Sequence, residues 1–272
     1  MGNNRGMNLL GREVYRTRDE QGWICVLENG QRRFLAFGNQ VEQSCMSLGE
    51  PHRLEHVYTQ AMMLATLFPA ALERATLLGL GGGSLARALL HYFPRCRVTA
   101  VEQRALVAAI ARQFFELPHD PRLRVIIADA GDHLAGPRKR SDLILADLYG
   151  SDGMDPQQCQ PAFLGRCRAA LTCHGVLAVN LWNDDYRDSR AARAALVEAF
   201  DGMVLQLHVA GGNSISFAFA GQLPDLKRRQ FFAQAQALGL SMGIPLQRLA
   251  RNLWFQNSGV LQYGHPPDSL AR

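Results

Sequence analysis

The sequence lacks the features that mark secreted, membrane-spanning and metal-binding proteins. The first residues, Met-Gly-Asn-Asn-Arg-Gly, have neither an apolar signal core nor the hydroxyl residue that N-myristoylation requires. No apolar run reaches the length of a membrane span, so we expect no membrane partner. The six cysteines form no C-x-x-C pair and have no zinc-type spacing, so we expect no metal site. We expect reduced thiols in a cytoplasmic protein. The cysteines are Cys25, Cys45, Cys96, Cys159, Cys167 and Cys173.

Concentrated charge is also absent. Charged residues make up 19% of the 272 residues and hydrophobic residues 47%, a composition typical of a globular protein, and the net charge is +5. The basic residues form only small clusters, at 138–140 and 227–229, and no known nucleic-acid-binding module surrounds them. We interpret the clusters as solvated surface and expect no nucleic-acid partner. A basic surface can still steer an anionic ligand toward the protein.

Short apolar runs separated by turn residues open the chain. Runs at 13–17, 23–27 and 33–37 have a β-type composition. Asn29-Gly30 lies between two of them and is a typical hairpin turn. We therefore predict a small antiparallel N-terminal β-domain over residues 1–51.

Strand-like and helical patterns alternate in the middle of the chain. A helical pattern over 54–68 precedes the first strand of this region. Such alternation predicts an α/β fold with a doubly wound, mostly parallel sheet of the Rossmann-like type over residues 52–223. The last part, residues 224–272, predicts one helix over 226–238 and a polar tail, packed on this core. We predict strands near 76–80, 97–101, 123–128, 142–147, 176–180, 203–209 and 214–219.

A cluster of glycines follows the first strand of the α/β region. Gly79, Gly81, Gly82 and Gly83 lie between an apolar run and a helical pattern. Glycines at such a junction let the backbone turn sharply and approach a ligand, and the following helix offers free N–H groups. The next strand ends in Glu102, about 20 residues on, where a carboxylate binds ribose hydroxyls in nucleotide-binding folds. The pair predicts a nucleoside-bearing ligand rather than a structural turn.

Acids follow the other strands in register with the glycine turn. Asp129 and Asp147 each end a strand, and ligands of doubly wound sheets bind outside the carboxyl ends of the strands. Asp129 is suited to accept a hydrogen bond from the exocyclic amine of adenine, with the Ala130 N–H meeting a ring nitrogen. Asp147 would then face the reacting end of the ligand.

Two other candidate groups have simpler explanations. His52 and His56 lie four residues apart, but without a third ligand at a telling spacing they are better interpreted as surface or capping residues. Tyr149 and Trp182 follow strand ends, where they would wall a pocket or pack in the core.

The order of these motifs resembles that of the spermidine synthases, the polyamine aminopropyltransferases. The resemblance covers roughly residues 10–215. Its closest counterpart is the divergent bacterial spermidine synthase-like branch, which shares the Gly-Leu-Gly-Gly-Gly-Ser turn. The motifs that carry it are Tyr58-Thr-Gln60, Leu78-Gly-Leu-Gly-Gly-Gly83, Val101-Glu102, Asp120-Pro-Arg122-Leu-Arg-Val125, Ala128-Asp129-Ala130, Asp142-Leu-Ile-Leu-Ala-Asp147 and Asn180-Leu-Trp182.

The resemblance implies an enzyme that transfers an aminopropyl group from decarboxylated S-adenosylmethionine to putrescine or a related amine. By position, Glu102 would hold the ribose and Asp129 the adenine, while Gln60 and the glycine turn would face the sulfonium. Tyr58 would lie beside the amine. Asp147 matches the catalytic carboxylate, which binds a protonated amine and accepts its proton during attack. The resemblance also implies a homo-oligomer.

Two departures from the family pattern leave alternatives open. Ser84 stands where the family has an aspartate for the amine of the transferred group, and a serine carries no negative charge. Gly150 replaces a second aspartate, although Tyr149, Asp152 or Asp155 could still contact the amine substrate. A methyltransferase that uses intact S-adenosylmethionine therefore remains an alternative. So does a nucleoside-binding protein that has lost catalysis.

Overall fold

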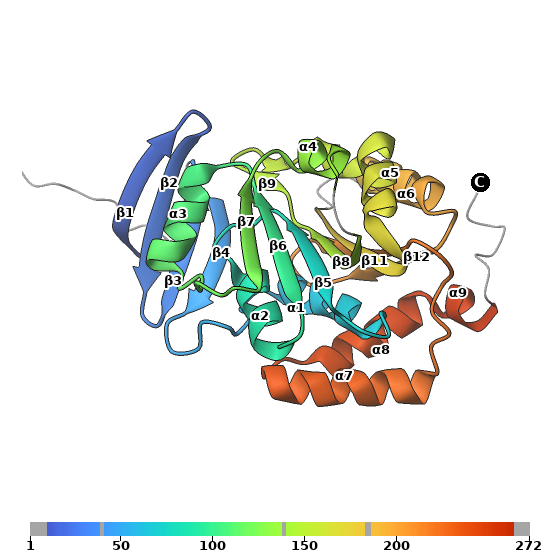
Figure 1. The fold of residues 1–272 in the computed structure, drawn as a ribbon. Coiled ribbons are helices and arrows are strands. Elements are labelled where there is room, and N and C mark those ends of the chain that lie inside the picture. The colour runs from blue at the N-terminus through green and yellow to red at the C-terminus, as the bar shows by residue number, and fades with distance from the viewer. Residues whose placement is uncertain (1–9, 39–40, 138–139, 183–185, 264–272) are drawn as a thin grey trace, which may run out of the picture.

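The central element of the structure, a computed structural model, is a seven-stranded sheet (Figure 1). The structure describes residues 10–38, 41–137, 140–182 and 186–263. The strand order is β12-β13-β11-β8-β5-β6-β7. The strands are β5 (Arg74–Leu78), β6 (Arg97–Glu102), β7 (Leu123–Ile127), β8 (Ser141–Ala146), β11 (Leu171–Trp182), β12 (Val204–His208) and β13 (Asn213–Phe219).

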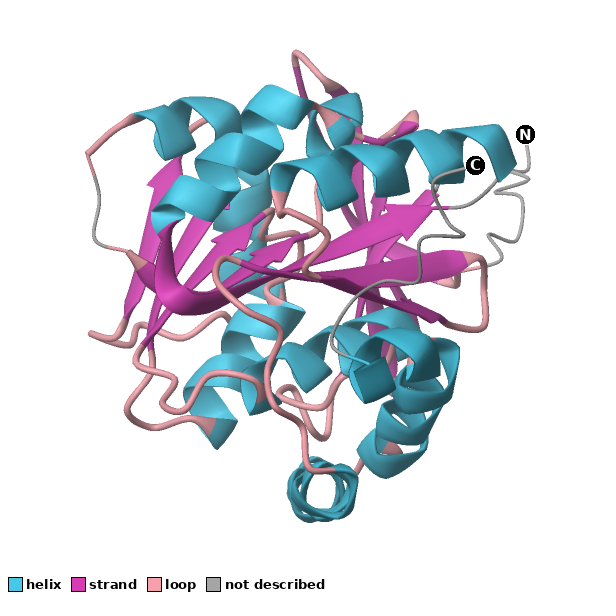
Figure 2. Cartoon of the chain, turned by 90° about the vertical axis from the view of Figure 1, so that its right-hand side faces the viewer, coloured by secondary structure: helices cyan, strands magenta, loops and turns pink. Residues whose placement is uncertain are grey.

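The sheet is doubly wound, as the sequence predicts. Strands β7, β6, β5, β8 and β11 run parallel to one another. At the other edge of the sheet, β13 pairs antiparallel with β11, and β12 pairs antiparallel with β13. Because both faces are covered, residues 143–146 of β8 form a continuous apolar run: Leu143 and Leu145 face one core, and Ile144 and Ala146 the other. In Figure 2 the sheet lies between two layers of helices. Helices α1 (Val57–Met62) and α2 (Ser84–Tyr92) cover one face, and α4 (Ala130–Ala135), α5 (Pro161–Ala170) and α6 (Tyr186–Ala199) the other.

A separate antiparallel sheet forms the N-terminal part of the fold. Its strands β1 (Arg12–Asp19), β2 (Gly22–Asn29), β3 (Arg32–Phe37) and β4 (Val41–Ser47) pair in chain order. The first three correspond to predicted runs, whereas the sequence does not predict β4, because four of the seven residues in VEQSCMS are polar and they do not alternate with apolar ones. One face of this sheet packs against α3 (Ala105–Phe114), which joins it to the main sheet (Figure 1).

A buried ion pair fastens the two sheets together. Arg104, which precedes α3 and is 6% exposed, donates through Nε and Nη2 to the carboxylate of Asp19 at the end of β1. Its guanidinium also lies 4.4 Å from the ring centroid of Phe37. The hydrogen bonds from Arg104 lower the pKa of the Asp19 carboxyl below its ordinary value.

Substituting Asp19 by asparagine is expected to lower stability at neutral pH by about 2 kcal/mol, because a charged hydrogen-bonded partner of buried Arg104 is lost. Thermal melting should show a decrease in Tm of roughly 5 °C. Since the folded pKa is depressed, the stabilisation is present above the pKa of the unfolded chain and is lost as pH falls through the folded pKa. The Tm difference should therefore close in acid. Asp201→Asn is the control, because that carboxylate pairs with Arg168 but is 68% exposed, and it should change little.

The C-terminal region contains more helix than the sequence predicts. Instead of one helix over 226–238 and a tail, it forms α7 (Arg228–Met242), α8 (Leu246–Gln256) and α9 (Ser258–Tyr263). Gly243 ends α7 in the left-handed conformation at φ 64°, and the chain reverses into α8. The apolar residues of α8 recur at helical spacing and are buried against the main core: Leu246, Leu249, Ala250, Leu253 and Trp254. No described helix is long and apolar enough to span a membrane.

Candidate active site

A cavity of about 1070 Å³ opens at the carboxyl ends of β5, β6 and β8. The strand order reverses between β5 and β8, which is where ligands bind in doubly wound sheets. The main sheet forms one side of the cavity and the N-terminal sheet contributes residues 41–44 of β4. Of the residues that the sequence singles out, the lining includes Tyr58, Gly79, Gly81, Glu102, Asp147, Tyr149, Asp152 and Trp182.

The glycine turn is required by close approaches of backbone and side chains. Gly79 has φ +94°, and a Cβ placed there would lie 2.3 Å from the carbonyl oxygen of Asp147. The Gly82 N–H donates to Oγ of Ser44 in β4 over 2.9 Å. Glycine therefore lets the end of β5 lie directly against the end of β8 on one side and against the N-terminal sheet on the other.

Glu102 is held at the cavity by the backbone around it. Its Oε2 accepts from the N–H groups of Leu80 and Gly81, over 3.1 and 3.3 Å, and its Oε1 accepts from the Arg104 N–H over 2.9 Å. Burial raises the pKa of this carboxyl, although the three backbone hydrogen bonds act to lower it. A carboxylate has about four acceptor positions, so three backbone donors leave capacity for a ligand hydroxyl.

Asp147 lies at the end of a chain of buried amides. Asn180 Nδ2 donates to Oδ1 of Asp147 over 2.8 Å, and Asn213 Nδ2 donates to Oδ1 of Asn180 over 2.9 Å. The bond from Asn213 fixes the orientation of the Asn180 amide, so that its NH₂ group faces the carboxylate. Burial raises the pKa of Asp147, while hydrogen bonds with Asn180 and Tyr58 lower it. The pKa of Tyr58 is raised well above its ordinary value by burial and by the neighbouring Asp147.

Replacing Asn213 by alanine is expected to lower kcat by about three- to tenfold, because one hydrogen bond that orients Asn180 is lost. When Asn180 is held less firmly, its hydrogen bond lowers the pKa of Asp147 to a smaller extent, so this pKa should rise. The acid limb of the pH profile should therefore move to higher pH. Steady-state kinetics across pH measures both effects. Asn252→Ala, on the exposed side of α8, is the control. An unchanged pH profile in Asn213→Ala would exclude a positioning role.

A short hairpin and a contact between a histidine and a glutamate complete the cavity wall. Strands β9 (Tyr149–Gly150) and β10 (Gly153–Met154) pair over the loop after β8, and the Tyr149 hydroxyl donates to the Asn180 carbonyl over 3.2 Å. Across the cavity, Nε2 of His56 lies 3.1 Å from Oε1 of Glu42 in β4. His52 stacks on His91 instead, so the two histidines do not share a site.

Five predicted binding residues do not line the cavity. Asp129 caps α4, accepting from the Asp132 N–H over 3.0 Å, and Nε2 of Gln157 lies 3.3 Å from its other oxygen. Gln60 donates to the Leu54 carbonyl over 2.8 Å. Their predicted roles toward the nucleoside stay predictions. The five residues outside the lining are Gln60, Gly82, Gly83, Asp129 and Ala130.

The structure brings to the cavity residues that the sequence does not single out. Glu42 lies on the unpredicted strand β4, and Asn213 follows the Gly211-Gly212 pair at the start of β13. The sequence feature that could have pointed to Asn213 is a polar residue directly after a pair of glycines.

Asp155 lines the cavity but caps a 3-10 helix (Pro156–Cys159), accepting from the Gln157 N–H over 2.9 Å. Within the described ranges, no group of three or more His, Cys, Asp or Glu side chains is placed to hold a metal ion.

Comparisons with known proteins first define the class of this fold. A probable spermidine synthase from Corynebacterium glutamicum matches with a TM-score of 0.70 and 20% identity, covering 89% of this chain and 94% of that one. Human methyltransferase-like protein 13, solved in complex with SAH, matches with a TM-score of 0.60 and 25% identity, covering 69% and 93%. The fold is therefore that of Rossmann-like transferases with a small N-terminal antiparallel sheet.

Sequence similarity narrows this class to a family. A polyamine aminopropyltransferase of Neisseria meningitidis serogroup A is 33% identical over 245 residues, which cover 89% of this chain and 93% of the relative. No protein-family model matches the chain. The chain belongs to the polyamine aminopropyltransferase, or spermidine synthase-like, family, and it is a transferase.

Proposed function

We propose that this transferase moves an aminopropyl group from decarboxylated S-adenosylmethionine to a polyamine such as putrescine, with Asp147 as the base. The observation that carries the proposal is the Asp147 carboxylate, which Asn180 fixes in the lining of a cavity that Glu102 also lines. Glu102 would bind the ribose hydroxyls of the donor. Tyr58 and Tyr149, which flank Asp147 on the lining, would contact the amine.

The charges of the cavity support a cationic substrate. Its two basic side chains are already paired, Arg104 with Asp19 and His56 with Glu42. An ammonium-bearing amine would offset the excess negative charge, which a carboxylate-bearing acceptor would increase. The lining contains five acids: Glu42, Glu102, Asp147, Asp152 and Asp155.

The proposed reaction depends mainly on removal of a proton from the amine and on alignment of the amine with the donor. A protonated amine has no lone pair, so it must lose a proton to Asp147 as it attacks. The new N–C bond forms at the carbon next to the sulfonium while the C–S bond breaks, and methylthioadenosine leaves as a neutral thioether. The raised pKa of Asp147 makes its carboxylate a better proton acceptor than an exposed one.

Incubation of the chain with putrescine and decarboxylated S-adenosylmethionine tests the proposal. Mass spectrometry should show putrescine heavier by one aminopropyl group, together with an equal amount of methylthioadenosine. A gain of one methyl group from intact S-adenosylmethionine would assign the chain to methyl transfer instead. Absence of both products with any diamine, despite binding of methylthioadenosine, would contradict the proposal.

A second candidate, in which the donor is intact S-adenosylmethionine, is favoured by the surroundings of Ser84. Nη2 of Arg87 lies 3.3 Å from Oγ of Ser84, which lines the cavity. Arg87 is 5% exposed and its guanidinium donates to the carbonyls of Pro51, Gly82 and Phe115, while burial lowers its pKa to about 10. Among the described residues no carboxylate pairs with it. A positive charge here suits the carboxylate of intact S-adenosylmethionine.

Introducing an acid at this position should shift the choice of donor. We expect Ser84→Asp to change the ratio of the two dissociation constants by about tenfold toward the decarboxylated donor, because a charged hydrogen bond to its ammonium is gained. Isothermal titration with each donor measures the ratio. Ser151→Asp, which adds the same charge elsewhere on the cavity lining, is the control. An equal shift in both variants would mean that net charge alone sets the preference.

A further inference from the structure

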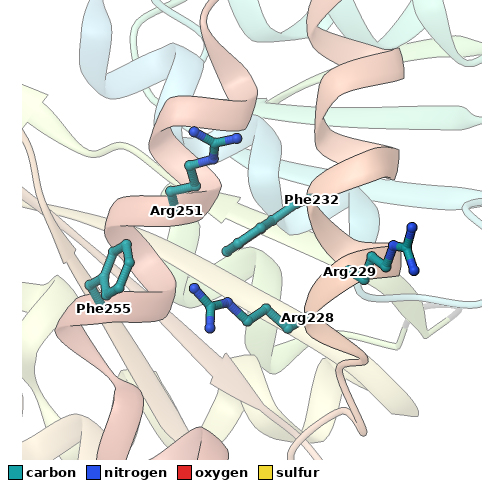
Figure 3. Close-up of a pocket in the computed structure, with 5 residues that line it drawn as sticks. All are labelled: Arg228, Arg229, Phe232, Arg251 and Phe255. Atoms are coloured by element: carbon teal, nitrogen blue, oxygen red, sulfur yellow. The ribbon is translucent and has the colours of Figure 1, made fainter.

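A second groove lies between α7 and α8, away from the active-site cavity. It has a volume of about 470 Å³ and shares no lining residue with that cavity. Figure 3 shows Arg228 reaching from α7 toward α8, with Phe232 pointing into the groove between the two helices. The lining consists of Arg228, Arg229, Phe232, Arg251 and Phe255.

Two of the three arginines of this groove, Arg228 and Arg251, lie over aromatic rings. The guanidinium of Arg228 lies 5.7 Å from the ring centroids of both Phe232 and Phe255, and that of Arg251 lies 5.9 Å from Phe232. All three arginines of the groove are exposed, and no described carboxylate pairs with any of them. Rings hold the guanidinium planes in place while their N–H groups stay available.

The whole helical pair lacks acidic residues. The sequence contains no Asp or Glu between Asp225 and Asp268, although it contains Arg248 and Arg251 on α8 and a Lys-Arg-Arg run at 227–229. That run lies at the N-terminal end of α7, with no acid in its first turn. Cations at this end oppose the helix dipole and lower helix stability. The sequence predicts a solvated surface at 227–229, but folding places Arg251 and two aromatic rings beside it.

We propose that this groove binds single-stranded nucleic acid. Arg228 and Arg251, with Arg248 one turn away, would contact successive phosphates. The ring of Phe255, which is 62% exposed, would stack on a base. A chain of regularly spaced phosphates is the ligand that matches several exposed arginines that have no carboxylate partner among the described residues and lie beside an exposed ring.

Other occupants fit the groove less well. A second copy of this chain docking symmetrically through the same face would bring its arginines against these arginines, and like charges repel. An acidic peptide would pair with the guanidinium groups but would supply no flat ring system for Phe255.

Fluorescence anisotropy with a dye-labelled oligouridine of about 12 nucleotides, within the usual range of site sizes, tests the proposal on the full chain. The double variant Arg228→Gln/Arg251→Gln should bind at least tenfold more weakly. Its slope of log K against log salt should fall by roughly 1.4, the value for two lost phosphate contacts on a single strand. Phe255→Ala should weaken binding about tenfold with an unchanged slope, since stacking carries no charge.

The control Arg95→Gln/Arg124→Gln removes two exposed arginines elsewhere on the surface. The proposal is supported if this control binds the oligouridine as tightly as the parent chain and the groove variant binds it more weakly. Equal weakening in both pairs would mean that net charge alone binds the oligonucleotide, and it would overturn the proposal. So would oligoglutamate competing as well as unlabelled oligouridine, or no binding by the parent chain.

Discussion

Replacing Asp147 by asparagine is expected to lower kcat by about 10²- to 10⁴-fold, the range for loss of a general base. Asparagine has nearly the same shape and keeps an oxygen that can accept from Asn180, so the cavity should stay intact. Binding of methylthioadenosine, measured by calorimetry, should therefore change little. The parent enzyme should lose activity as pH falls through the raised pKa of Asp147, because the base must be ionised. The variant should lose this acid limb.

Asp152→Asn provides the matched control for that substitution. Asp152 is exposed on the hairpin loop and lines the same cavity, so its removal should raise KM for the amine and leave kcat nearly unchanged. Should Asp147→Asn keep its full kcat in an assay where the parent enzyme turns over, the base must be another group.

Substituting Gly79 by alanine should have the second largest effect, on both stability and catalysis. The added Cβ would meet the Asp147 carbonyl oxygen at 2.3 Å, and the φ of +94° is unfavourable for alanine. Strain of this kind costs about 3 kcal/mol, which corresponds to a Tm lower by roughly 7 °C. A displacement of Asp147 by about 1 Å would lower kcat by a further 10²-fold. Thermal melting and steady-state kinetics below the new Tm measure the two effects.

Gly22→Ala separates the effect of backbone strain from that of contact. Gly22 has φ +109°, but a Cβ placed there meets nothing within 4 Å. We expect this control to lose some stability and to keep its kcat. If both glycine variants lose kcat equally, contact between β5 and Asp147 is not what matters at position 79.

The doubly wound sheet and much of the cavity could be predicted from the sequence because local patterns determine them. Strands buried on both faces give continuous apolar runs such as the one before Asp147, and the topology then brings their carboxyl ends together. The family was also predicted from the order of these motifs, and the 33% identity to the Neisseria relative confirms it.

Contacts between distant parts of the chain were not predictable in the same way. Residues 41–44 of β4 line the cavity and three of them are polar, so the sequence of this strand lacks the apolar alternation that marks a strand. The helix α8 was missed because its apolar spacing lies among arginines and glutamines, although five of its residues are buried. Asp129 caps a helix, a contact that only the three-dimensional structure reveals, and its predicted role toward adenine stays a prediction.

The amide chain from Asn213 through Asn180 to Asp147 also constrains when the enzyme becomes active during synthesis. Glu42 emerges early, but Asn213 is among the last residues of the main sheet to leave the ribosome. Contacts over such long separations form late, because loop closure must precede them. A nascent chain that ends before β13 would therefore hold Glu102, Asp147 and Asn180, but it would lack the bond from Asn213 that orients the Asn180 amide toward Asp147. If Asp147 is the base that we propose, such a chain would turn over more slowly than the complete sheet.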